Sequence, residues 1–165
     1  MDNTTPRRRG TRKSLGQHFL VDGAYLNRII KASDLSQNDL VVEIGPGQGA
    51  LTSRLLEMAG QVICVEIDEY LSAGLMDRLY NPSNLTVINA DARFIDIETV
   101  TSNRPYKLVA NLPYYAANPI VRKFLEADNS PTRMIVMVQR EVARSMLAKP
   151  GKMNILSVAT QCYAM

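Results

Sequence analysis

Residues 40–49 read LVVEIGPGQG, and this stretch decides the fold. Residues 40–44 form a short, largely apolar run that is rich in β-branched side chains, which is typical of a buried strand. Residues 45–49 interrupt the run with three glycines and a proline, and leucines then recur at helical spacing over residues 51–58. The stretch therefore predicts a strand, a glycine turn and a helix.

The same unit repeats along the chain. Four more apolar runs predict strands at residues 61–65, 84–88, 106–110 and 134–138. Helical spacing of apolar residues predicts helices at residues 24–33, 69–80, 118–127 and 141–148. Residues 155–164 predict one further strand, whose apolar edge would favour self-association. The alternation predicts an α/β fold with a doubly wound, mostly parallel sheet between two layers of helices.

The composition predicts a single domain. The chain has 165 residues, of which 46% are hydrophobic, enough to fill one core. No apolar run approaches the ~18 residues of a membrane span, and the first residues lack a secretory signal, so we expect a soluble, cytoplasmic protein. Cys64 and Cys162 have no CxxC spacing and no histidine nearby. We therefore expect no metal site and no disulfide, with both cysteines packed as small core residues.

The basic charge lies at one end of the sequence. Residues 1–14 hold five of the 19 basic residues and one of the 16 acidic ones, so the rest of the chain is close to neutral. We expect residues 1–14 to form a flexible basic arm and residues 15–165 to form the folded domain. A cationic arm suits contact with RNA phosphates. A solubilising tail is the alternative.

Polar residues close the predicted strands. In a parallel sheet, ligands bind beyond the carboxyl ends of the strands, so Gly45, Glu66, Asp91 and Asn111 are expected to meet in one crevice. The glycine turn, including Gly47, lets the backbone approach a ligand and presents helix N-terminal amides to it. A tight turn with no ligand is the simpler interpretation of the glycines alone.

Two acids predict that the crevice binds a nucleoside. Glu66 ends the second strand 21 positions after Gly45, where a carboxylate accepts hydrogen bonds from both hydroxyls of a ribose. Asp91 follows the third strand and is placed to accept a hydrogen bond from an adenine amino group. The alternative for each acid is a solvated loop side chain.

Residues 111–114 read NLPY and are the most informative stretch for chemistry. Asn111 and the Pro113 region supply acceptors for the protons of an exocyclic amine, which frees the lone pair of its nitrogen. Tyr114 supplies a ring that can stack on a base. Without the other motifs, a proline turn with a core tyrosine would be the default interpretation.

Six stretches together resemble the ribosomal RNA adenine dimethyltransferases over roughly residues 14–162. They read GQHFL, VEIGPGQG, EID, NAD, NLPY and QREVA, at residues 16–20, 42–49, 66–68, 89–91, 111–114 and 139–143. The resemblance implies a Rossmann-like methyltransferase fold that uses S-adenosylmethionine as its cofactor. It also implies dimethylation of N6 on two adjacent adenosines of small-subunit ribosomal RNA during ribosome biogenesis.

The resemblance also implies roles for individual residues. His18 and Leu20 would flank the cofactor, Gly45 would line its methionine end, and Glu66 and Asp91 would hold its ribose and its adenine. Asn111 would lie between the cofactor and the target base, and Tyr114 would stack on that base. No metal is implied, and no general base is required, because in-line displacement at a sulfonium needs chiefly proximity, orientation and a freed lone pair.

The resemblance sets further expectations and leaves alternatives. Family members continue past residue 165, so we expect a domain truncated before its last strands and lacking the C-terminal helical RNA-binding domain. The expected partner of this monomer is small-subunit ribosomal RNA or a pre-30S-type particle. Arg140 and Arg144, followed by Lys149 and Lys152, form a second phosphate-facing patch or a solvated helix face.

The alternatives in function are a large-subunit methylase of the macrolide-resistance type, a non-catalytic RNA-binding assembly factor and a dehydrogenase. The third glycine of the turn comes one residue too early for the dinucleotide fingerprint, which counts against the dehydrogenase.

Overall fold

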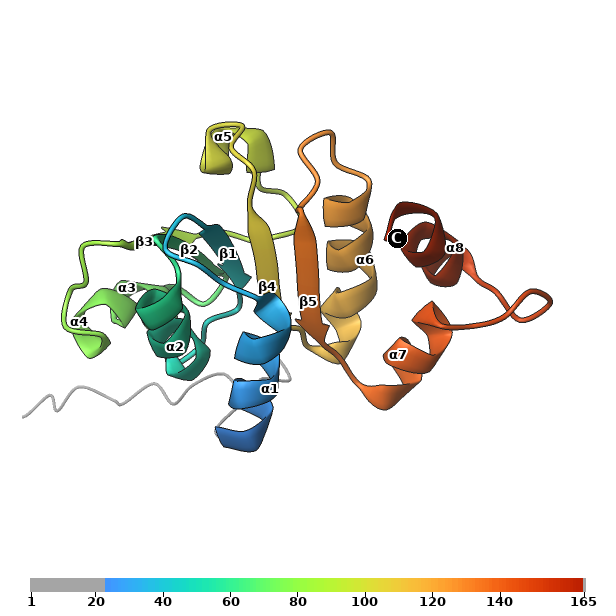
Figure 1. Ribbon diagram of the computed structural model, residues 1–165, viewed down its shortest axis with the longest axis horizontal. Helices are drawn as coiled ribbons and strands as arrows, with labels where there is room; N and C mark the ends of the chain where they lie inside the picture. Colours follow the sequence, from blue (N-terminus) through green and yellow to red (C-terminus); the bar gives the residue numbers. More distant parts are fainter. Residues whose placement is uncertain (1–22, 165) are drawn as a thin grey trace, which may run out of the picture.

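The protein folds around one parallel sheet. The computed structural model describes residues 23–164, without the side chain of Tyr114. All four strand pairs are parallel, as predicted, and the strands lie in the order β3-β2-β1-β4-β5 (Figure 1). The strands are β1 (Leu40–Ile44), β2 (Gln61–Glu66), β3 (Leu85–Asn89), β4 (Lys107–Asn111) and β5 (Arg133–Met137).

Helices cover both faces of the sheet because successive strand side chains point in opposite directions. Val41 packs into a core with α1 (Gly23–Ser33), α2 (Ala50–Met58) and Leu75. Val42 packs into the opposite core, whose helices are α5 (Ile97–Thr101), α6 (Tyr114–Leu125), α7 (Arg140–Met146) and α8 (Ile155–Tyr163). The sheet is thus doubly wound, as the continuous apolar strands indicate.

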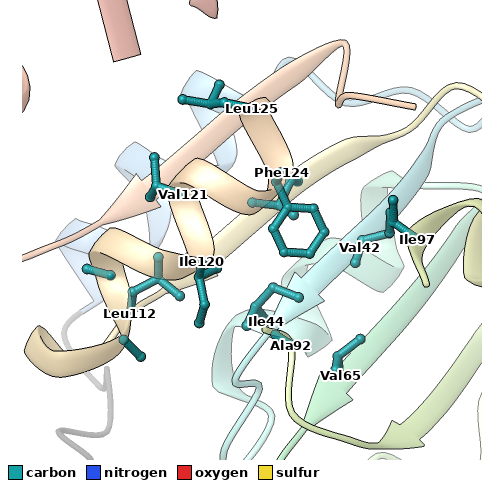
Figure 2. Close-up of a cluster of buried hydrophobic side chains, with 14 of the residues drawn as sticks. Val42, Ile44, Val65, Ala92, Ile97, Leu112, Ile120, Val121, Phe124 and Leu125 are labelled. Atoms are coloured by element: carbon teal, nitrogen blue, oxygen red, sulfur yellow. The ribbon is translucent and has the colours of Figure 1, made fainter. Parts of the chain in front are cut away.

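The larger core joins the centre of the sheet to α6. Phe124 and Ile120 on α6 point toward Val42 and Ile44 on β1 (Figure 2). Phe124 is completely buried. A side chain of this size contributes roughly 1.5–3 kcal/mol when it leaves water. This packing fixes α6, and with it the strand-to-helix connection that carries residues 111–114.

The segment 69–80 forms two short helices, so the prediction of one continuous helix is wrong. α3 (Glu69–Ala73) ends at Gly74, and α4 (Leu75–Arg78) begins there. The Arg78 guanidinium folds back past Gly74 and donates to the Leu71 carbonyl (2.5 Å) and the Gly47 carbonyl (3.4 Å). A side chain at position 74 would occupy the space that this guanidinium uses.

Three further segments differ from the secondary structure that the sequence predicts. The helix predicted from residue 118 begins at Tyr114, because Ala116 and Ala117 already donate to the Pro113 carbonyl (3.0 and 3.1 Å). Residues 155–164 were expected to form a strand but form α8, so no apolar strand edge lies there. Asp96 caps the short α5, which the sequence does not predict.

The two cysteines differ in environment. Cys64 is buried, as expected, but Cys162 is exposed on α8, so the prediction that both are core residues is wrong for Cys162. Among residues 23–164, no helix has the length and apolar character needed to cross a membrane.

Candidate functional site

A crevice opens at the carboxyl ends of the strands. It encloses a cavity of about 480 Å³, within the range of small-molecule sites. Six of the predicted site residues line it, from four separate strand ends: Gly45, Gly47, Glu66, Asp91, Asn111 and Pro113. The parallel topology brings them together, since every strand ends at the same edge of the sheet.

The glycine turn needs its glycines for conformation. Gly45 and Gly47 have φ values of 71° and 58°, in the left-handed region that side chains with a Cβ disfavour. The Gly45 N–H donates to the Val65 carbonyl (2.9 Å), which ties the turn to the neighbouring strand β2. The turn leads directly into α2, so its backbone faces the crevice at a helix N-terminus.

Glu66 fastens the glycine turn to the end of β2. Its side chain is only 2% exposed. Oε2 accepts from the Gly47 N–H (3.1 Å) and Oε1 from the Asp68 N–H (3.0 Å). A carboxylate offers about four acceptor positions, so two backbone bonds leave capacity for a ligand with two hydroxyls.

Glu43 is a second buried acid in the crevice, and the sequence predictions missed it. It lies on β1, is 1% exposed and lines the cavity. Cys64 donates its S–H to Glu43 Oε2 (3.3 Å). Burial, with a smaller repulsion from Glu66, raises the Glu43 pKa to about 7. The available signal was a lone charge within an apolar strand that is buried on both faces.

Asp91 forms the rim of the crevice together with Arg93. The two side chains form an ion pair, with Nη2 and Oδ2 2.5 Å apart, and the Arg93 Nε–H and backbone N–H also bond the carboxylate. The hydrogen bond from Arg93 is the main cause that lowers the Asp91 pKa. Asp91 is therefore an oriented, ionised acceptor at the mouth of the cavity. Arg93 also lines the crevice, which the sequence does not predict.

The NLPY stretch connects β4 to α6. Asn111 ends β4, and Leu112 and Pro113 line the cavity beside it. The Pro113 carbonyl accepts two N–H groups at the start of α6, so its lone pairs are committed to the helix. Tyr114 is the first residue of α6, and its side chain lies outside the described part of the structure.

The remaining predicted contacts lie outside the described residues. His18, Leu20 and the basic arm at residues 1–14 precede residue 23, where the description begins. Within residues 23–164, no group of three or more histidine, cysteine or acidic side chains is placed to hold a metal ion. Tyr25 and Tyr115 also line the crevice, although neither is among the predicted site residues.

Comparison with known sequences identifies similar proteins. The profile of a family described as ribosomal RNA adenine dimethylase matches residues 8–165. A ribosomal RNA small subunit methyltransferase A from Dehalococcoides mccartyi is 46% identical over 92% of this chain and 53% of its own length. The protein of the same name from Clostridioides difficile is 43% identical over 92% of this chain and 54% of its own. The chain thus spans about half the length of the curated relatives it matches.

Solved structures share the fold. A dimethyladenosine transferase from Plasmodium falciparum superposes with a TM-score of 0.72 at 27% identity, over 86% of this chain and 50% of that one. The 23S rRNA methyltransferase ErmE superposes with a TM-score of 0.68 at 34% identity, over 78% and 50%. The five-stranded sheet therefore has the Rossmann-like architecture of methyltransferases.

Proposed function

Because the chain belongs to the ribosomal RNA adenine dimethylase family, we propose that it binds S-adenosylmethionine in this crevice and dimethylates adenine N6 in small-subunit ribosomal RNA. We also propose that it acts as a monomer in the cytoplasm, and that residues 15–165 form the cofactor-binding domain. Residues 1–14 would contact RNA phosphates of the small-subunit RNA or of a pre-30S-type particle.

One observation carries the cofactor proposal. Glu43 and Glu66 are both buried and both line the crevice, and neither forms an ion pair with any cation among residues 23–164. Buried carboxylates are costly unless a positive charge or hydrogen bonds compensate them. S-adenosylmethionine carries a positive sulfur and a positive amino group. The residues that line the cavity therefore fit this ligand by charge as well as by size.

Different residues of the crevice would contact different parts of the cofactor. Glu66 would accept from the ribose hydroxyls, with the two acceptor positions that Gly47 and Asp68 leave open. Asp91 would accept from the adenine amino group at the rim, and the turn at Gly45 and Gly47 would line the methionine end.

Two residues of the proposed contact set lie before the described part of the chain. His18 and Leu20 would flank the cofactor.

The chain contributes to methyl transfer by orienting the target base. When bound, the cofactor supplies a methyl group on a positively charged sulfur. Asn111 would accept a hydrogen bond from an N–H of the target amine, which keeps the nitrogen lone pair available, and Tyr114 would stack on the base. Leu112 is the better placed backbone acceptor, because the Pro113 carbonyl already accepts two helix N–H groups. Holding the amine in line with the methyl group is the main catalytic effect.

The small-subunit substrate is favoured over the large-subunit one. Relatives named for the small subunit reach 46% identity over 92% of the chain, whereas the 23S rRNA methyltransferase ErmE reaches 34% over 78%. Glu66, Asp91 and Asn111 are all present at the crevice, which argues against a purely non-catalytic assembly factor.

A calorimetric titration tests the cofactor proposal. We expect saturable binding of S-adenosylmethionine and none of a nicotinamide dinucleotide. Glu66→Gln should weaken binding about 10- to 100-fold, since hydrogen bonds to charged groups contribute roughly 1.5–3 kcal/mol. Glu57→Gln is the control, because Glu57 is exposed on α2 and pairs only with Arg54. Binding that Glu66→Gln leaves unchanged would contradict the assigned crevice.

Transfer of labelled methyl groups tests the activity. We expect incorporation into under-methylated small subunits, and loss of incorporation in Asn111→Ala while binding of S-adenosylmethionine persists. Incorporation only into large-subunit RNA would favour the alternative substrate. A chain that binds the cofactor and transfers no methyl group to either RNA would support the non-catalytic role.

A further inference from the structure

An aromatic cluster stands at one side of the crevice mouth. Phe94 is 79% exposed and Tyr115 is 51% exposed, which is unusual for rings of this size. Arg93 links them: its guanidinium lies 5.3 Å from the centroid of the Phe94 ring and is close enough to Tyr115 to interact with it electrostatically. Arg93 and Tyr115 both line the cavity.

A hydrogen-bonded turn places Phe94 at the surface. The Phe94 N–H donates to the Asp91 carbonyl (2.9 Å), and the Arg93 N–H donates to Asp91 Oδ1 (2.9 Å). The neighbours Ala92 and Ile95 are buried in the core and anchor both ends of the turn. The backbone at Phe94 therefore need not be ordered when a flat partner stacks on the ring, which favours such a contact.

A cationic segment begins at another side of the same mouth. Gln139 lines the cavity, and α7 starts at the next residue. The segment 140–152 carries four exposed cations and one acid, Glu141, and among the described residues none of these cations forms an ion pair. The cations are Arg140, Arg144, Lys149 and Lys152. Nine cations of the described chain form no ion pair, and four of the nine lie in this one segment, so uncompensated positive charge is concentrated there.

We propose that a single RNA strand crosses the mouth of the crevice, with a base that neighbours the target stacked on Phe94 and with its phosphates along residues 140–152. This inference rests on the proposed function and adds the surface that holds the RNA. Exposed rings and uncompensated cations around one crevice mouth are the combination that single-stranded nucleic acid requires, since bases stack on the rings and phosphates pair with the cations. The Arg93 charge is already balanced by Asp91, so the phosphate contacts fall to α7 and the loop after it.

Binding of short RNA strands tests the stacking contact. Fluorescence anisotropy would compare a single-stranded RNA with an abasic strand of the same length. Phe94→Ala should weaken binding of the base-containing RNA about 10-fold and leave the abasic strand unchanged, because stacking contributes roughly 1–3 kcal/mol per base. Tyr70→Ala is the matched control, since Tyr70 is 77% exposed and does not line the crevice. Equal loss for both strands, or no loss, would overturn the stacking contact.

The salt dependence of RNA binding tests the phosphate contact. Arg144→Gln should lower the slope of log K against log salt by about 0.7, the value for one phosphate on a single strand. Lys31→Gln is the control, because Lys31 is exposed near the end of α1 and lies far from the crevice mouth. The neighbouring Ala32 carbonyl accepts a hydrogen bond from Arg133, which begins β5 at the end of the sheet opposite the crevice. An unchanged slope for Arg144→Gln would overturn this contact.

The same samples separate the two proposals. Titration of each variant with S-adenosylmethionine should give the wild-type affinity, because neither Phe94 nor Arg144 lines the cavity. If the wild-type chain binds the cofactor but no RNA, the surface is wrong and the cofactor site stands. If it binds RNA as expected but not the cofactor, the proposed function is wrong and the RNA surface stands.

Discussion

Two buried carboxyl groups with different partners define the chemistry of the crevice. Glu66 accepts two backbone N–H groups, which stabilise its charge. Glu43 accepts only from side chains of Thr52 and Cys64, and burial is the largest influence on its pKa. Glu66 is thus tied to the backbone of its own site, while Glu43 releases its proton only near neutral pH.

The raised Glu43 pKa predicts a stability that depends on pH. The pKa is about 7 in the folded protein against an ordinary 4.5, so the folded state holds the proton more tightly. This contribution is fully present below about pH 4.5 and is lost as the pH rises through 7. Glu43→Gln stays neutral, so at pH 8 it should unfold at higher urea concentration than wild type, with a gain of up to about 3 kcal/mol.

The difference between the two proteins should vanish near pH 4.5. Glu57→Gln is the control, because Glu57 is exposed and its loss should leave the pH profile of stability unchanged. A gain for Glu43→Gln that is the same at every pH would contradict a titrating Glu43.

Individual site residues were predictable to different degrees. Glu66, Asp91 and Asn111 were found because each follows an apolar run, and parallel strands all end at one edge. Glu43 was missed because it lies within a strand, where its neighbours make it look like part of an apolar run. The pairing of Asp91 with Arg93 depends on a turn geometry that residue order alone does not specify.

At the scale of elements, helix capping explains why residues 155–164 form a helix where a strand was predicted. The β-branched residues of the segment 155–164 favour a strand, yet the segment forms α8. Asn154 accepts from the Ser157 N–H (3.0 Å), and the Ser157 hydroxyl accepts from the Asn154 N–H (2.6 Å). This capping box satisfies the first turn of the helix, and Leu156 and Ala159 then fall on one buried face.

The capping box predicts the effect of removing its first residue. Asn154→Ala should lower the free energy of unfolding by about 1 kcal/mol, since it leaves the first N–H groups of α8 without their partner. Chemical denaturation with far-ultraviolet circular dichroism measures this. Asn38→Ala, in an exposed turn, should have almost no effect. Equal stability of the two variants would mean that α8 does not depend on its cap.

At the scale of the whole molecule, the parallel character of the sheet follows from physical rules, whereas the helix boundaries do not. Alternating strands and helices impose a parallel sheet with crossover helices, and the order β3-β2-β1-β4-β5 places the glycine turn at the switch between the two halves. The break at Gly74 arises from a long-range contact of Arg78 with the Gly47 carbonyl. No local pattern in residues 69–80 carries that information.

A ligand that joins these strand ends should stabilise the whole domain. S-adenosylhomocysteine at about 100 times its Kd adds roughly 2.7 kcal/mol, which for a chain of this size raises the Tm by about 5–10 °C. Differential scanning fluorimetry measures the shift. Glu66→Gln should show a much smaller shift at the same ligand concentration. A shift of equal size in both proteins would place the ligand elsewhere.

The two cysteines differ in exposure, so their reaction with a thiol reagent reports when the folded domain opens. Cys64 lies under the crevice with its pKa raised by burial, whereas Cys162 is exposed on α8. A maleimide dye should therefore label Cys162 within the native state and reach Cys64 only when the centre of the sheet comes apart. In the Cys162→Ser variant, the rate of thiol labelling therefore measures how often the centre of the sheet opens.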